Sequence, residues 1–276
     1  MTIHLTGKFV SWEEAVNWLK FQPEQQELVR ACFYDDPLTA AAERYYASTE
    51  WRAVQKLIEN CQKGRALDIG AGRGISSYAL ARDGWSVSAL EPDPSPVVGA
   101  AAIRVLAADN ILDISTVESW GEQLPFSDNS FELVYARQVL HHAHNLMELC
   151  REIFRVLKPG GTLLATREHV ISRPEDLDAF LAGHPLHGLY GGEHAYLLAD
   201  YRAAISASGL TLTQTLATYS SDINLYPVTV AGLREKVEKK LSLALPEAVF
   251  RKFLIPMLNL LHGEPGRLYT FLGQKP

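Results

Sequence analysis

The stretch ALDIGAGRGISSYALARDGWSVSALEPD, residues 66–93, decides the fold. A short apolar strand leads into a turn with glycines at positions 70, 72 and 74, a helical segment follows from residue 75, and a second apolar strand ends at Glu91. This order predicts a βαβ unit that holds a nucleotide or nucleoside at the turn, because glycine lets a ligand approach the backbone where the helix begins.

The same alternation continues beyond this unit. Further strands are expected at 113–119, 131–136, 162–168, 211–219 and 267–273, with helices at 99–110, 146–157 and 198–209 between them. The pattern predicts an α/β Rossmann-like, doubly wound sheet with right-handed crossovers. We expect an N-terminal helical cap (1–62), a core (63–223), a helical insertion or lid (224–265) and a final core strand (266–276).

Composition narrows the choice of partner. The net charge is −6 and 47% of the residues are hydrophobic, whereas nucleic acids and anionic membranes attract basic surfaces. A small-molecule partner is therefore expected, with no nucleic acid and no membrane. The three cysteines have no paired spacing, and no stretch resembles a membrane span or a leader peptide, which is typical of a cytoplasmic protein.

Asp68 indicates which nucleoside the turn selects. It lies two residues before Gly70, where a pyrophosphate would meet a second negative charge at the helix start. The third glycine also comes one residue earlier than in the dinucleotide fingerprint, and Ile75 takes its place. S-adenosylmethionine (SAM) carries no phosphate and has two cationic groups, so it is the ligand that this charge favours. Glu91 is then placed to accept bonds from both ribose hydroxyls, with Pro92 beside the adenine.

Four segments together carry a family resemblance: DIGAGRG (68–74), the acid of LEPD (90–93), GEQLPFSDNSFELVYA (121–136) and RVLKPGG (155–161). They resemble the class I SAM-dependent methyltransferases, particularly those that act on small molecules. The resemblance covers residues 66–170 by motif and extends to 219 and to 266–276 by element order. It implies a seven-stranded sheet with an antiparallel last strand, SAM as cofactor, S-adenosylhomocysteine (SAH) as product, and methyl transfer to a small molecule.

The resemblance also assigns cofactor contacts. Asp68 would receive the amino group, directly or through water, and the backbone of the turn would pass under the methionine part of SAM. The family usually has an acid where this chain has Trp120, so either the indole covers the adenine or Ser119 or Glu122 supplies the polar contact. The resulting cofactor set is Asp68, Gly70, Ala71, Gly72, Gly74, Glu91, Pro92, Ser119, Trp120, Gly121, Glu122 and Arg137.

Groups for the transfer itself are expected at strand ends and in one loop. Methyl transfer requires alignment and, for a protonated acceptor, a base. The candidate bases are His141, His142, Glu168, His169 and His194. Against this, His142 could merely support the following helix. A metal-binding set of His184, His187, Glu193 and His194 has irregular spacing, so no metal is expected.

Four further residues are predicted to bind the acceptor: Tyr45, Tyr46, Gln138 and Tyr190. Tyr45 and Tyr46 have helical-core spacing as the alternative explanation. Arg137 could bind a substrate carboxylate or phosphate, or the carboxylate of the cofactor. In the insertion, Phe250, Phe253 and neighbouring apolar residues indicate either a partly apolar acceptor or a homodimer contact.

Two other functions share parts of the pattern. A nicotinamide-dinucleotide oxidoreductase would use the same strand, glycine turn and Glu91. A non-catalytic SAM-binding sensor or scaffold would keep the nucleoside pocket and could tolerate the change at Trp120. The acceptor and the atom methylated (O, N, S or C) stay open.

Overall fold

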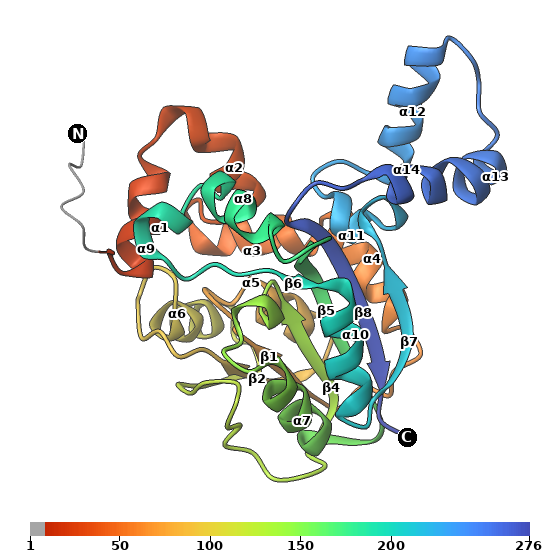
Figure 1. The fold of residues 1–276 in the computed structure, drawn as a ribbon. Helices are drawn as coiled ribbons and strands as arrows, with labels where there is room; N and C mark the ends of the chain where they lie inside the picture. The colour runs from red at the N-terminus through yellow and green to blue at the C-terminus, as the bar shows by residue number, and fades with distance from the viewer. Residues whose placement is uncertain (1–8) are drawn as a thin grey trace.

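One twisted sheet forms the centre of the structure, a computed structural model that describes residues 9–276 (Figure 1). Its strands lie in the order β3-β2-β1-β4-β5-β8-β7, and the two-residue β6 pairs with β5. β8 runs antiparallel to both β5 and β7, and the other pairings are parallel. The expected Rossmann-like sheet of seven strands with an antiparallel last strand is therefore confirmed, with β6 as an addition. The strands are β1 Arg65–Ile69, β2 Ser86–Leu90, β3 Ile114–Val117, β4 Phe131–Arg137, β5 Leu157–Ile171, β6 Tyr196–Leu197, β7 Thr211–Leu216 and β8 Arg267–Gln274.

Helices cover both faces of this sheet. Residues 9–62, the described part of the expected cap, contain four α-helices and no strand; residues 1–8 lie outside the described residues. The α-helices are α1 Trp12–Lys20, α2 Gln26–Ala31, α3 Leu38–Tyr46, α4 Thr49–Leu57, α5 Ile75–Arg82, α6 Ala100–Asn110, α7 Leu146–Val156, α8 Asp176–Gly183, α9 His187–Tyr190, α10 Leu198–Ala207, α11 Asp222–Leu225, α12 Val230–Leu241, α13 Glu247–Val249 and α14 Ile255–Leu261. Short 3₁₀ turns lie at Pro23–Gln25, Leu140–His142 and Thr218–Ser220, and a π-helical segment at Phe250–Leu254.

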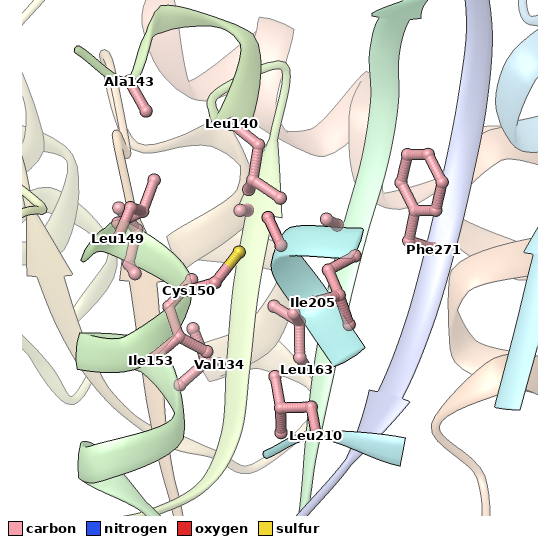
Figure 2. Packing of buried hydrophobic residues seen from close by; sticks show 14 of the residues in the cluster. Val134, Leu140, Ala143, Leu149, Cys150, Ile153, Leu163, Ile205, Leu210 and Phe271 are labelled. Carbon is pink, nitrogen blue, oxygen red and sulfur yellow. The ribbon is translucent and has the colours of Figure 1, made fainter. Parts of the chain in front are cut away.

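Strand side chains alternate between the two helical layers, as the pleat requires. On β4, Leu133 and Tyr135 pack with α3, α4 and α5, while Val134 packs with α7 and α10. Figure 2 shows the second of these layers, in which Cys150 and Ile153 of α7 meet the strands. Burying a side chain such as Ile153 contributes about 1.5–3 kcal/mol to stability. This packing fixes the carboxyl ends of the parallel strands at one edge.

The RVLKPGG segment, residues 155–161, leads directly from α7 into β5, so the strand begins earlier than the expected residue 162. Residues 157–161 belong to β5, and Leu157 pairs with Phe131 before a register shift. The Gly160 N–H donates to Lys275 O at 2.8 Å, and Lys275 N–H donates to Gly161 O at 2.9 Å. The end of the chain therefore satisfies the backbone groups that would otherwise make this segment a free turn.

The helical insertion begins later than expected. α11 crosses the predicted boundary at 223/224, because Ile223 is buried in the core and the Asn224 side chain donates to Leu216 O at 2.9 Å. Beyond it, α12 to α14 form a unit with its own small cluster of Val230, Phe250 and Ile255. Figure 1 shows this unit projecting from the body, on the opposite side from α1 and α9. In residues 9–276 no helix has the length and apolarity to cross a membrane.

Candidate active site

A cleft of about 530 Å³ lies beyond the carboxyl ends of β1, β2, β4 and β5. At one end its wall is the glycine turn and Glu91, and at the other end it is a group of histidines. Fifteen of the sequence-predicted site residues line it: Gly70, Ala71, Gly72, Glu91, Pro92, Ser119, Trp120, Gly121, Glu122, Arg137, Gln138, His141, His142, His169 and Tyr190.

The glycine turn requires its glycines. Gly70 and Gly72 have φ of +59° and +55°, in the left-handed region that L side chains rarely adopt. A Cβ on Gly70 would also lie 2.7 Å from Val139 Cγ2. Gly74 has φ of +87° and caps α5; it does not line the cleft and therefore shapes the turn rather than touching its contents.

Asp68 lies beneath the cleft wall instead of on it. Its Oδ2 accepts hydrogen bonds from Ser76 Oγ at 2.8 Å and Ser77 Oγ at 2.6 Å, whereas the buried Oδ1 has no partner. Burial raises the pKa of Asp68 to about 6, against the opposing effect of the serine hydrogen bonds. Ser76 does line the cleft, so Asp68 is in reach of a ligand only through Ser76, a water molecule or a small rearrangement.

Glu91 stands at the end of β2 with both oxygens already oriented. Oε2 accepts the Gly72 N–H at 2.8 Å, and Oε1 accepts the Asp93 N–H at 2.9 Å. Burial raises the pKa of Glu91 to about 7, although these two backbone donors act in the opposite direction. Each oxygen keeps a lone pair for a ribose hydroxyl.

Trp120 is 66% exposed and does not fill a gap under the sheet edge. It stands at the cleft with His144, their rings edge-on at 6.4 Å. Glu122 Oε1 accepts the His144 N–H at 2.9 Å, so one of its oxygens is in use. A Cβ on Gly121 would lie 2.8 Å from Leu149 Cδ1, which explains glycine at this close approach.

Arg137 is occupied by a partner inside the protein. Its Nε lies 2.7 Å from Glu50 Oε1 and its Nη2 lies 3.1 Å from Glu50 Oε2, a bidentate pair with a carboxylate that has no solvent exposure. Nη1 donates to Gln138 Oε1 at 3.1 Å. α4 brings Glu50 against the fork, and the expected contact of Arg137 with a substrate or cofactor anion stays a prediction.

A connected group of side chains forms the other end of the cleft. His141 Nδ1 lies 2.7 Å from Glu168 Oε2, and His169 Nδ1 lies 2.8 Å from Gly266 O. Burial lowers the pKa of His169 to about 4 and that of His141 well below its usual value, so both imidazoles are neutral near pH 7. Glu168 also accepts backbone N–H groups from Val139 and His141 and does not line the cleft. Its oxygens hold the turn that follows β4, and its expected role as a base stays a prediction.

The loop between α8 and β6 adds an acid to this group. Glu193 is buried, and the hydroxyl of Tyr190 donates to its Oε1. Its Oε2 lies 3.7 Å from His141 Nε2 and 4.0 Å from His142 Nε2, and its Oε1 lies 3.7 Å from His184 Nε2. His142 Nδ1 lies 3.0 Å from Gly192 O, which leaves its Nε2 free.

Three predicted contacts lie elsewhere. Tyr45 is fully buried and its hydroxyl lies 3.0 Å from that of Tyr135, while the Tyr46 hydroxyl donates to Asp83 at 2.9 Å. Both belong to α3, where Tyr45 packs in the core and Tyr46 contacts the end of α5. The ring of His194 lies tilted against that of Tyr196, with ring centroids 4.4 Å apart, and His194 does not line the cleft. The expected acceptor role of Tyr45 and Tyr46 and the expected base role of His194 stay predictions.

Sequence reasoning missed the contribution of the first two helices to the cleft wall. The lining residues in or directly after these helices include Trp12, Leu19, Leu28, Cys32 and Tyr34. Arg73, His184 and Glu193 also line the cleft and come from other parts of the chain. The amphipathic pattern of α1 marked a buried face but could not show that part of this face borders a ligand. No residue of the 224–265 insertion lines the cleft, and the lid role of this insertion stays a prediction.

The turn end of the cleft fits SAM. An orphaned buried carboxylate oxygen on Asp68, side-chain-free backbone at Gly70 and Gly72, and an oriented acid at Glu91 match its ammonium, methionine backbone and ribose. Fold and site thus define a Rossmann-like nucleoside-binding protein of the methyltransferase class.

Comparison with known proteins agrees with this class. A family model described as a methyltransferase domain matches residues 67–165. Demethylmenaquinone methyltransferase of Corynebacterium glutamicum is 35% identical over 99 residues, covering 36% of this chain and 39% of that protein. Ubiquinone biosynthesis O-methyltransferase of Rhizobium etli is 24% identical over 193 residues, covering 68% and 77%. Residues 67–165 therefore carry the methyltransferase domain of the class I SAM-dependent enzymes.

Solved structures share the fold. Geranyl diphosphate C-methyltransferase from Streptomyces coelicolor, solved with Mg²⁺, geranyl diphosphate and SAH, has a TM-score of 0.60 at 13% identity, covering 94% of this chain and 87% of that chain. The matched region spans only 35–39% of the first curated relatives, YafE of Escherichia coli and the Corynebacterium enzyme.

Proposed function

We propose that the protein transfers the methyl group of SAM to a small-molecule acceptor held at the histidine end of the cleft. One observation carries this proposal: the glycine turn with Glu91 and the group of His141, His142 and His169 line the same cavity of about 530 Å³. A donor bound at the turn and an acceptor bound beside the histidines would therefore lie in one enclosed space.

Methyl transfer from SAM places few chemical demands on the protein. The sulfonium of SAM is a good leaving group, so the chain must align the acceptor with the methyl carbon and take up any proton that the acceptor loses. His142 is the group we assign to the proton, because its ring is held through Nδ1 by Gly192 O and its Nε2 is free. We assign Gln138 and Tyr190 to the acceptor as well.

The cleft wall indicates the kind of acceptor. Trp12, Leu19 and Leu28 give it an apolar side, and the histidines and Glu193 give it a polar end. We propose an acceptor with an apolar body and one polar group that carries the methylated atom. The relatives named for demethylmenaquinone and for ubiquinone biosynthesis support a small-molecule acceptor.

A thermal-shift series with SAH, SAM and NAD tests the proposal, because a ligand that binds only the folded form raises the melting temperature. We expect a rise with SAH and SAM, none with NAD, and loss of the rise in Glu91→Ala. A rise with NAD alone would identify a dinucleotide oxidoreductase instead.

A kinetic experiment tests the assignment of His142 as the base. With an acceptor found by screening, His142→Ala should lower kcat about 100-fold or more, the usual contribution of a general base, and leave SAH affinity unchanged. His187→Ala, which changes a histidine of α9 outside the cleft, is the matched control and should leave both unchanged. SAH binding without transfer to any acceptor class would favour the sensor alternative.

A further inference from the structure

Three side chains from separate parts of the fold converge at the polar end of the cleft. His141 comes from the 3₁₀ turn after β4, His169 from the end of β5, and Glu193 from the loop that precedes β6. Each offers one ligand atom, and these atoms lie within 4.8 Å of one another. All three residues line the cleft, so the point of convergence is open to a ligand.

Both imidazoles are held in the orientation that a metal ligand requires. His141 Nδ1 donates to the Glu168 carboxylate at 2.7 Å, and His169 Nδ1 donates to Gly266 O at 2.8 Å. With the proton on Nδ1, the lone pair of each ring is on Nε2, which is the unused nitrogen. A carboxylate or carbonyl behind a histidine is the usual arrangement around protein-bound metals, because it fixes the tautomer and orients the ring.

No Lys or Arg side chain of the described residues compensates the negative charge of Glu193. Glu193 is 8% exposed, and its charged or ionisable neighbours in residues 9–276 are histidines and Tyr190, with no Lys or Arg within ion-pair distance. Burying an uncompensated carboxylate is costly. The hydroxyl of Tyr190 donates to Oε1, which leaves Oε2 directed at His141 Nε2, 3.7 Å away.

We propose that His141 Nε2, His169 Nε2 and Glu193 Oε2 bind one divalent transition-metal ion, such as Zn²⁺, Co²⁺ or Fe²⁺, on the cleft wall. Two imidazoles and one carboxylate suit these ions, whereas Mg²⁺ and Ca²⁺ prefer ligands that are all oxygen. Metal–ligand distances of about 2.0–2.2 Å require the three ligand atoms to move together by about 1 Å. The remaining coordination positions face the cleft.

The ion has a role if the proposed methyl transfer is right, and this part of the inference rests on that function. A hydroxyl oxygen of the acceptor would occupy an open position, and the ion would lower its pKa. The oxygen would lose its proton to the His142 imidazole and form the new bond to the methyl carbon as the carbon–sulfur bond breaks, with SAH released. The inference therefore selects acceptors with an ionisable oxygen next to the reacting position.

Co²⁺ titration of the full-length protein, stripped with EDTA, tests the site, because bound Co²⁺ has visible absorption bands that report its ligands. We expect one equivalent to bind, with the bands abolished and the affinity lowered about 100-fold or more in His169→Ala and in Glu193→Gln. His187→Ala changes a histidine of α9 that does not line the cleft, and it should bind Co²⁺ as the unaltered protein does.

The wild-type titration is decisive even if a variant fails to fold. Failure of the folded wild-type protein to take up an equivalent of Co²⁺ or Zn²⁺, or equal uptake by His169→Ala and Glu193→Gln, would overturn the metal site. SAH binding, measured on the same samples, separates this result from the proposed function: SAH binding without metal uptake rejects only the site, and metal uptake without SAH binding rejects only the methyl-donor assignment.

Discussion

Glu91 shows how one side chain links the fold to the ligand. It ends β2, it is almost fully buried, and its two oxygens are held by the N–H groups of Gly72 and Asp93. Burial, together with the nearby charges of Asp93 and Asp68, raises its pKa to about 7. The carboxyl group is therefore half protonated at neutral pH when no ligand is bound, whereas ribose hydroxyls require the ionised form as acceptor.

SAH affinity should consequently depend on pH. Because the ligand favours ionised Glu91, the dissociation constant should fall by up to about tenfold per unit as pH rises toward 7, and level off above it. Asp68, with a pKa of about 6, extends the slope to lower pH. Isothermal titration calorimetry from pH 5.5 to 8.5 measures this; Glu91→Gln should bind weakly and lose the portion of the slope near pH 7. A flat wild-type profile would contradict the assignment.

The raised pKa of Glu91 also makes the stability of the unliganded protein depend on pH, in the opposite direction to SAH affinity. The folded-state pKa of Glu91 lies above the ordinary value of 4.5, so the folded form binds the proton more tightly than the unfolded chain does. The contribution of Glu91 to stability is therefore fully present below about pH 4.5 and is lost as pH rises through 7. If SAM or SAH binds as proposed, its ribose hydroxyls would compensate this loss by donating to the ionised carboxyl.

At the scale of elements, α4 joins the cap to the sheet through a buried charge. Glu50 has no solvent exposure, forms the bidentate pair with Arg137 at the end of β4, and lies 4.0 Å from Arg167 Nη1 on β5. Removing one member of such a group leaves the others buried without compensation. The helix thus fixes the ends of two strands that carry cleft residues.

Glu50→Gln should lower the free energy of unfolding by about 3–5 kcal/mol, because Arg137 would keep its charge without an acid. For a chain of this size that corresponds to a fall in Tm of about 6 °C or more. Glu118→Gln removes the partner of Arg104 from an exposed pair and is the matched control, with an expected change of no more than about 1 kcal/mol. Equal Tm values for the two variants, measured by calorimetry, would show that the buried pair adds nothing.

At the scale of the whole molecule, the cleft is covered from one side only. α1, α2 and the loop between α8 and β6 supply its outer wall, while the unit of α12 to α14 projects on the other side and exposes Phe253 and Leu260 (Figure 1). Because this unit exposes apolar side chains, the homodimer contact stays a prediction. We expect the N-terminal helices, rather than this unit, to border the acceptor.

The double substitution Phe253→Ser and Leu260→Ser should therefore leave SAH affinity unchanged, because neither residue lines the cleft. Trp120→Ala provides the contrast: loss of an aromatic contact with the adenine should weaken SAH about threefold to tenfold. Calorimetry gives the affinities, and light scattering on the same samples shows whether the double substitution halves the mass. A large effect of the double substitution on SAH affinity would place the insertion at the site after all.

The sequence by itself determined the sheet, the glycine turn and the donor end of the cleft. Strand alternation, the spacing of Gly70 and Gly72, and the acid that ends β2 are local features, because backbone geometry and side-chain periodicity act over a few residues. They were sufficient for the fold and for the glycine turn with Glu91, whereas the family resemblance was needed to predict Ser119, Trp120, Gly121 and Glu122 as cleft residues. The sequence also showed that Trp120 replaces the acid that is usual in the family, but it did not show that the Trp120 side chain is exposed.

Only the tertiary structure decided which long-range partner each polar group has. Arg137 was free to bind an anion in the sequence, but helix packing placed Glu50 against it; Tyr45 and Tyr46 were used by the core. The same packing brought together His141, His169 and Glu193, a group that the sequence did not suggest; the set considered there, His184, His187, Glu193 and His194, shares only Glu193 with it. Side chains at the ends of different strands and loops meet because a sheet aligns strand ends, and that alignment is set by the packing of the whole chain rather than by any local pattern.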